Sequence, residues 1–379
     1  MAGKKKQLSK KIHKNARAFF KLDKILFLIL SVWLLLGLLI FSSAALGLMA
    51  KNNSLLSDIL SKQILTLIIS FVLMLFVARI PFKKIISFAP YIYAISVILS
   101  LLVFVPGLSF SAGGARRWIV IFGQSLQPAE FMKYSSILFL VYLLLRFKRN
   151  MKDLKSLLYP VLVLALPLAI LVMEPDTSTS FVIVFGVAVV YFLFGAPWKN
   201  IAIASTAALI LFAGMALTHP YILKRFTSFA DSSQDALGAS YQINQALIAV
   251  GSGGFWGKGY GQGVQKFGYL PEPVGDAVFA TLAEEFGFFG GIILLTLLTL
   301  FILRAFKLAK HSKSIAASGT LLAFSLTIFI QAFVNIAAMT AVLPLTGLTL
   351  PFFSLGGTSM LATLLAFGVI FSAAKSVKI

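Results

Sequence analysis

The sequence contains no cysteine and few residues that bind metals or carry a negative charge. The absence of cysteine excludes disulfides, thiol nucleophiles and cysteine-based metal sites. The three histidines, His13, His219 and His311, lie too far apart to show zinc-ligand spacing. Only 12% of the residues are charged, and 59% are hydrophobic. A chain of this composition cannot bury its apolar surface in one core, so it needs lipid as part of its solvent.

The net charge of +21 raises the question of a nucleic-acid partner. The Lys and Arg residues occur in short clusters between apolar runs, and they do not form one continuous basic face. Such clusters beside apolar runs orient a membrane protein. We therefore expect no nucleic-acid partner.

Apolar runs long enough to cross about 30 Å of hydrocarbon recur ten times. They predict an all-α integral membrane protein with a basic cytoplasmic segment at 1–24 and a single transmembrane domain at 25–379. The first run is too long for a signal-peptide core of about 7–15 residues, so we expect an uncleaved span. The predicted spans are 25–48, 62–80, 88–105, 128–146, 157–173, 178–195, 200–217, 277–304, 315–343 and 358–374.

The basic residues predict how these spans are oriented. With the spans above, 24 of the 33 Lys and Arg residues fall on the side that holds both termini. Short cytoplasmic loops carry this kind of excess, so both termini are expected to be cytoplasmic. The large connection at 218–276, between spans seven and eight, is then extracytoplasmic, as are the loops at 106–127, 174–177 and 344–357. These segments hold nearly all the unusual polar residues, so we expect the functional site outside.

The loop at 106–127 and the start of the next span carry a basic motif. Arg116 and Arg117 stand on the side that basic residues normally avoid, and arginine forks suit pyrophosphate oxygens. Glu130 and Lys133 follow one helical turn apart. Interfacial anchoring and an ordinary ion pair are the alternative interpretations. Asp176, before the sixth span, favours helix capping.

A glycine-rich stretch follows a short amphipathic helix predicted at 241–248. Its glycines allow backbone amides to approach an anion closely, and Lys258 and Lys266 lie within and after it. The spacing matches neither a nucleotide-binding P-loop nor a dinucleotide fingerprint. A flexible loop is the alternative.

Three carboxylates fall within ten residues at the start of the span at 277–304. Asp276 is placed at the helix entrance, Glu284 two turns deeper near the same face, and Glu285 opposite. Asp276 suits a helix N-cap, but carboxylates at membrane depth are costly and usually functional. Gln331 and Asn335, one turn apart in the ninth span, are expected to bond between helices or to line a cavity.

These motifs, in this order, resemble the SEDS family of cell-wall polymerases, represented by FtsW and RodA. The chain departs from the family pattern at four places. Val274-Gly275 stand where the family has His-Thr, Ala129 where it has Ser, Glu174 where it has Gln, and Leu355 where Tyr is common. The matching elements are Gly-Ala-Arg-Arg-Trp at 114–118, Gln-Pro-x-Glu at 127–130, Pro-Asp at 175–176, the glycine-rich run at 251–266, Leu-Pro-Glu-Pro-x-x-Asp at 270–276, Glu-Glu-x-Gly at 284–287 and the Leu-Pro-Phe segment at 350–359.

The resemblance implies a ten-helix glycosyltransferase that polymerises lipid II and expels undecaprenyl pyrophosphate. It implies Asp276 as the general base, a role that suits an attacking hydroxyl. It implies no certain cofactor and leaves open whether a divalent cation assists. The substrate-binding candidates are Arg116, Arg117, Glu130, Lys133, Lys258, Gln262 and Lys266, with Asp176, Glu284 and Ser354 in support.

Within the family, Val105-Pro106-Gly107 and the segment 269–273 favour the FtsW branch of cell division over the RodA branch of elongation. The implied partner is a class B penicillin-binding transpeptidase with other divisome proteins, or elongasome proteins for the RodA branch. The implied location is the bacterial cytoplasmic membrane. Two other classes stay open: a flippase for the same lipid, whose polar groups would lie near the bilayer midplane, and a scaffold without activity.

Overall fold

The computed structural model describes residues 22–50, 53–112, 115–121, 124–147, 151–218, 229 and 239–375. Three predicted features lie outside the described residues: most of the basic N-terminal segment, the Gly113-Gly114 pair and most of the first third of the connection at 218–276.

In the described part of the chain, a helix occupies each of the ten predicted ranges. Five boundaries differ from the predictions by four residues or more: α3 and α4 begin earlier, α4 and α12 end earlier, and α11 ends later. The helices are α2 (Lys24–Leu46), α3 (Asn53–Arg79), α4 (Phe82–Leu101), α5 (Ala129–Phe147), α6 (Leu158–Met173), α7 (Thr177–Leu193), α8 (Trp198–Thr218), α11 (Val278–Lys310), α12 (Ile315–Met339) and α13 (Gly357–Ala374).

The chain is a multi-pass membrane protein. Among the described residues, seven helices are long and apolar enough to cross a membrane. Their outward faces carry exposed apolar side chains such as Leu28 and Leu35 on α2 and Ile68 on α3, which suit contact with lipid. That all ten helices span the membrane, and that both termini are cytoplasmic, stay predictions.

The loop at 106–127 contains a small sheet that the all-α prediction missed. Strands β1 (Ser109–Ala112), β2 (Ala115–Ile121) and β3 (Gln124–Leu126) form an antiparallel sheet in that order. Phe110 pairs with Trp118, and Ile119 pairs with Leu126. The aromatic and β-branched residues that follow the arginines of β2 favour a strand, which the polar and glycine-rich surroundings concealed.

The core of the bundle is built on Trp33 of α2. This fully buried ring packs edge-on against Phe352, Phe301 and Phe367. A Cβ atom on Gly37 would lie 2.3 Å from the Phe352 carbonyl oxygen, so the 344–357 segment rests directly on α2. This segment is therefore held inside the protein, the condition under which non-helical backbone is tolerated at membrane depth.

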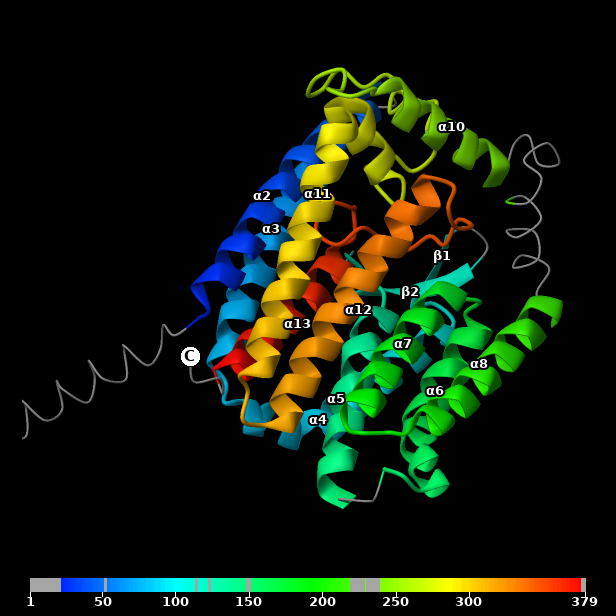
Figure 1. Cartoon of the computed structure of the whole chain (residues 1–379). Helices are drawn as coiled ribbons and strands as arrows, with labels where there is room; N and C mark the ends of the chain where they lie inside the picture. Colours follow the sequence, from blue (N-terminus) through cyan, green and yellow to red (C-terminus); the bar gives the residue numbers. More distant parts are fainter. Residues whose placement is uncertain are drawn as a thin grey trace, which may run out of the picture.

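Helix α10 (Ala239–Ser252) lies across one end of the bundle (Figure 1). It contains the amphipathic helix predicted at 241–248, which is confirmed. In Figure 1 the α10 end also carries the start of α11, and the sheet lies beside the same ends of α6 and α7. The polar motifs of the sequence are thus gathered at one end of the molecule.

Candidate active site

The two adjacent arginines of β2 lie in different environments. Arg116 is exposed, whereas Arg117 is half-buried. The Arg117 guanidinium donates to the carbonyl oxygens of Glu174, at 3.1 Å, and Pro175. Because successive side chains of a strand point to opposite faces, Arg117 attaches the sheet to the turn between α6 and α7, while Arg116 stays at the surface.

Asp176 caps α7, as its sequence context indicated. Its Oδ1 atom accepts a hydrogen bond from the backbone nitrogen of Thr179 at 3.1 Å. Its Oδ2 atom accepts one from the Gln127 side-chain amide at 3.3 Å, which connects this turn to the chain just after the sheet.

Glu174, two residues earlier, is a buried carboxyl group. Its side chain is 1% exposed, and neither carboxyl oxygen has a hydrogen-bond partner among the described residues. Burial raises the pKa of Glu174 to about 8, and the nearby Asp176 charge adds to this rise while Arg117 opposes it. This carboxyl is therefore mostly neutral at pH 7.

Glu130 and Lys133 form a buried ion pair in the first turns of α5. The Lys133 ammonium lies 2.9 Å from Glu130 Oε2, and both side chains are almost inaccessible. Lys133 also donates to the side-chain carbonyl of Gln331 on α12, at 2.7 Å. The Gln331 amide nitrogen donates in turn to the carbonyl of Thr349, at 3.0 Å. The pair is thus tied to the 344–357 segment.

Asp276 lies in a turn just before α11 and does not cap it. Ala277 holds the N-cap position, with no side-chain capping bond. The Gln242 amide of α10 donates to Asp276 Oδ1 at 3.1 Å. The Asn335 amide of α12 donates to the Asp276 carbonyl at 2.8 Å. Asp276 is partly exposed, so it meets solvent while two helices hold it.

Helix α11 is broken at Gly287, which has φ 62° and ψ −160°. The glycine-rich loop at 253–268 completes the backbone hydrogen bonds on both sides of the break. Cβ atoms on Gly253 and Gly257 would lie 2.1 Å from the carbonyls of Ala283 and Glu285, so this approach requires glycine. The bonds run from the nitrogens of Lys258, Gly259, Phe288 and Phe289 to the carbonyls of Glu284, Glu285, Gly254 and Phe255, respectively.

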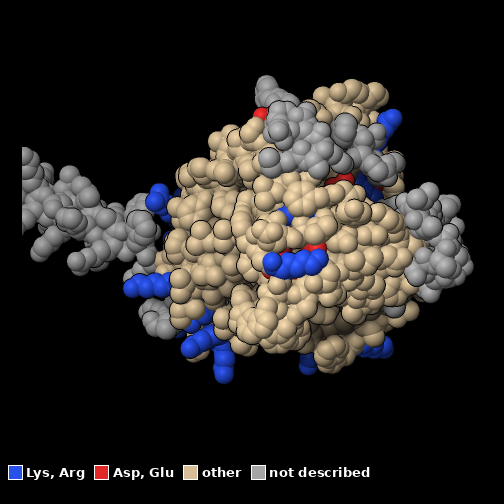
Figure 2. Space-filling view, turned by 90° about the horizontal axis from the view of Figure 1, so that it is seen from above, with Lys and Arg blue, Asp and Glu red and all other residues tan. Residues whose placement is uncertain are grey.

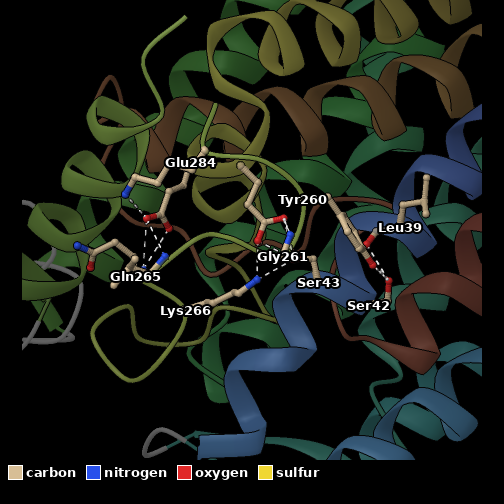
Figure 3. A network of polar contacts seen from close by, with 11 residues as sticks. Leu39, Ser42, Ser43, Tyr260, Gly261, Gln265, Lys266 and Glu284 are labelled. Carbon is tan, nitrogen blue, oxygen red and sulfur yellow. Dashed lines mark hydrogen bonds and ion pairs between the residues drawn. The ribbon is translucent and has the colours of Figure 1, made fainter. Parts of the chain in front are cut away.

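The same loop neutralises both glutamates of α11 (Figure 3). Lys258 lies 2.6 Å from Glu284, and Lys266 lies 2.5 Å from Glu285. Glu284 also accepts from the backbone nitrogens of Val264 and Gln265, and Glu285 accepts from Ser43 of α2 and from the Gly261 nitrogen. The loop amides do bind anions, but these anions belong to the same chain.

Two expectations for this region need refinement. Glu284 was expected near the Asp276 face of one helix; the structure places Asp276 just before α11 and pairs Glu284 with Lys258 of the loop, so the shared face stays a prediction. Of the two lysines, Lys266 is fully buried, whereas the Lys258 side chain is 32% exposed. Gln262 is exposed.

Ser354 lies in the non-helical segment before α13. Its hydroxyl oxygen accepts from the Leu350 nitrogen at 2.8 Å, which closes a turn. The next residue, Leu355, donates its backbone nitrogen to the Val274 carbonyl at 2.6 Å. Ser354 therefore shapes the segment whose Leu355 nitrogen bonds to the turn that carries Asp276.

The structure brings most of the predicted residues into two groups, apart from Arg116, Arg117 and Asp176 at the sheet and the turn that follows α6. Hydrogen bonds through Gln331, Asn335 and the 344–357 segment connect the Glu130–Lys133 pair with the Asp276 turn. The second group is the loop at 253–268 with Glu284 and Glu285. Figure 2 looks onto the end that carries α10, where basic and acidic side chains lie together near the centre of a mostly uncharged face. Among the described residues, no three acidic or histidine side chains are grouped to hold a metal ion.

Gln242 was missed in the sequence, because a glutamine on an amphipathic helix carries no local signal of its partner. Gln331 and Asn335 did carry one, since polar amides in an apolar span need partners. Their partners in the structure are Lys133 and Thr349 for Gln331, and Asp276 and Leu348 for Asn335, all at the candidate site.

Comparison with known proteins identifies relatives over nearly the whole chain. The model of a family described as cell cycle protein, covering FtsW, RodA and SpoVE, matches residues 23–379. The chain is 34% identical over 355 residues to a probable peptidoglycan glycosyltransferase FtsW of Marinomonas mediterranea, covering 92% of this chain and 87% of that protein. It is 35% identical over 315 residues to stage V sporulation protein E of Bacillus subtilis, covering 83% and 86%.

Solved structures share this fold. One chain of a solved peptidoglycan synthase complex, described as the structural coordination of polymerization and crosslinking, matches with a TM-score of 0.76 and 26% identity. The match covers 94% of this chain and 98% of that chain. The rod shape determining protein RodA of Thermus thermophilus matches with a TM-score of 0.69 and 26% identity, over 94% and 97%.

Proposed function

The chain belongs to the FtsW, RodA and SpoVE family, and from this premise we propose that it is a peptidoglycan glycosyltransferase that polymerises lipid II. The relatives named as probable peptidoglycan glycosyltransferases support this activity. The excess of basic residues at the opposite end of the helices supports a reaction on the outer face of the cytoplasmic membrane.

The observation that carries the proposal is the environment of Asp276. An aspartate before a helix usually caps it, as Asp23 and Asp176 do in this chain. Asp276 instead points its carboxylate to the α10 amide and stays partly exposed. A carboxylate that is held in place, reachable and not used for capping suits a general base.

In the proposed reaction, the 4-hydroxyl of one lipid-linked disaccharide attacks the anomeric carbon at the reducing end of the growing glycan chain. Asp276 takes the hydroxyl proton as the new carbon–oxygen bond forms. The bond to the lipid pyrophosphate breaks, and undecaprenyl pyrophosphate leaves with the bonding electrons. This leaving group needs positive charge nearby.

Arg116 is the strongest candidate for contact with the pyrophosphate, because it is exposed on the sheet beside the site. Lys258 is half-exposed, and it would have to share its charge between Glu284 and substrate. The buried pair of Glu130 and Lys133 shapes the site electrostatically. We assign Lys266 and Glu284 to support of the loop, and Gln262 to surface contact with the substrate.

We further propose a role in septal synthesis with a class B penicillin-binding transpeptidase as partner. FtsW-named relatives and the segment at 269–273 favour the division branch over the elongation branch. A relative of known structure belongs to a complex that polymerises and crosslinks peptidoglycan, which supports a crosslinking partner here.

The test is polymerisation of labelled lipid II by the purified chain together with its transpeptidase. We expect glycan polymer from the wild type and none from Asp276→Ala or Asp276→Asn. Asp153→Ala is the matched control, because this exposed carboxylate precedes the short 3-10 helix η3 (Leu154–Leu157), makes no side-chain capping bond and lies outside the site. It should polymerise like the wild type. Lipid transfer across vesicles without polymer, equal in wild type and Asp276→Ala, would support a flippase and overturn the proposal.

A further inference from the structure

We propose that Asn335 and Gln242 are positioning residues that fix the Asp276 carboxylate for catalysis. This inference rests on the proposed function and extends it to two residues that are not among the catalytic, substrate-binding or supporting candidates. Both are neutral amides, and each comes from a different helix.

The Asp276 turn has little support of its own. It is not helical, Glu272 within it has φ 49°, and Pro273 has no backbone N–H to donate. Its internal backbone bonds are those from the nitrogens of Gly275 and Ala277 to the Glu272 carbonyl. A base must be held within a fraction of an ångström of its productive geometry, so the turn needs external bonds.

Asn335 supplies such bonds from below. Its amide nitrogen donates to the carbonyls of Asp276, at 2.8 Å, and Leu348, at 2.7 Å. Because both neighbours are acceptors, only the amide nitrogen can face them, which fixes the orientation of this side chain. Asn335 is 1% exposed, so loss of its donors would leave the buried Leu348 carbonyl and the partly buried Asp276 carbonyl without these bonds.

Gln242 holds the other end of the residue. Its amide nitrogen donates to Asp276 Oδ1 at 3.1 Å from the half-buried face of α10. A neutral donor orients a carboxylate without adding a full charge beside it. The backbone is thus fixed by α12 and the carboxylate by α10.

The chain offers a matched control for each amide. Gln331 is equally buried one turn away on α12, but its side-chain amide bonds to Lys133 and Thr349. Asn244 lies two residues from Gln242 on α10, and its side chain is exposed. Neither control amide donates to Asp276 in the described contacts.

The experiment measures kcat and KM for lipid II, with the partner present, and the thermal unfolding midpoint of each variant. We expect Asn335→Leu and Gln242→Leu to lower kcat roughly tenfold to a hundredfold, with KM changed by less than about twofold. Gln331→Leu should differ from these two variants by raising KM, because it loosens the Lys133 pair. Asn244→Leu should match the wild type in both kcat and KM.

A second comparison separates positioning from simple packing. Gln242→Glu keeps the size of the side chain but replaces the donor with a like charge. If Gln242 positions Asp276, Gln242→Glu will be slower than Gln242→Leu; if it only fills space, Gln242→Glu will be the milder change. The inference is overturned if Gln242→Glu is the milder variant or if Gln242→Leu retains the wild-type kcat. A wild type that makes no polymer overturns the proposed function itself, which is a separate outcome.

Discussion

The Lys266 ammonium lies 2.5 Å from the Glu285 carboxylate, and neither side chain reaches solvent. Ser43 completes the pair, since its hydroxyl oxygen lies 2.8 Å from Lys266 Nζ and 2.6 Å from Glu285 Oε1. One buried cluster therefore joins α2, the loop at 253–268 and α11. Removing one charge leaves the other without compensation.

We predict that Lys266→Met lowers the free energy of unfolding by about 3–5 kcal/mol, as removal of one partner from a buried pair generally does. The double variant Lys266→Met with Glu285→Gln should recover most of this loss. Denaturation of the detergent-solubilised protein measures both. A Lys266→Met variant as stable as the wild type would contradict the structural role, and so would a double variant that is less stable than the single one.

The two glycines that flank the end of α10 should respond in opposite ways. Gly253→Ala places a Cβ atom 2.1 Å from the Ala283 carbonyl, so we expect a loss of more than about 2 kcal/mol. Gly251 lies inside α10 with open space around it, and Gly251→Ala should stabilise the protein by up to about 1 kcal/mol. Equal unfolding midpoints for the two variants would show that the loop does not pack into the α11 break.

The free energy of unfolding should decrease as pH rises, because of Glu174. Its folded pKa of about 8 lies above the ordinary value of 4.5, so the folded state binds the proton more tightly. The contribution of Glu174 is fully present below pH 4.5, declines as pH rises, and is lost above about pH 8. Glu174→Gln removes the titration and keeps the size of the side chain.

Unfolding of wild type and Glu174→Gln at pH 5, 7 and 9 provides the measurement. The free energy of unfolding of Glu174→Gln, relative to that of the wild type, should increase from pH 5 to pH 9. A constant difference between the two proteins would mean that Glu174 is ionised throughout and has a partner.

The adjacent arginines should separate binding from stability. Arg116→Ala should raise KM for lipid II and leave the unfolding midpoint unchanged, because this side chain is exposed. Arg117→Ala should lower the free energy of unfolding by about 1–3 kcal/mol, since two backbone carbonyls lose a charged donor. Polymerisation kinetics combined with unfolding curves will test this, and the reverse assignment would exchange the two roles.

The helices were predictable because apolar runs report directly on burial in lipid and protein. All ten predicted ranges contain a helix, although α12 ends at Met339, several residues before the predicted end. The sheet was not predictable from periodicity, since β1 and β3 are only four and three residues long. Such short strands depend on their neighbours for stability.

The partners of the charged residues were harder to predict than their importance. Lys258 and Lys266 stood out because the predicted topology puts them on the side that basic residues usually avoid, and the glycines between them suggested an anion. The anions are the carboxylates of Glu284 and Glu285. They lie within thirty residues of the lysines in sequence, and the ion pairs form where the loop packs against the interruption of α11. Ser43 lies more than two hundred positions from Lys266, and no local pattern specifies that contact.

The interruption of α11 at Gly287 also has a practical consequence for handling this protein. The residues that complete the backbone ladder of this helix belong to a connection that would ordinarily be chosen for an epitope tag, a fluorescent reporter or a shortened variant. An insertion between 254 and 259 would leave carbonyls and amides of α11 without bonds at the edge of the hydrocarbon, where water cannot fully replace them. Fusions are better placed at the chain ends.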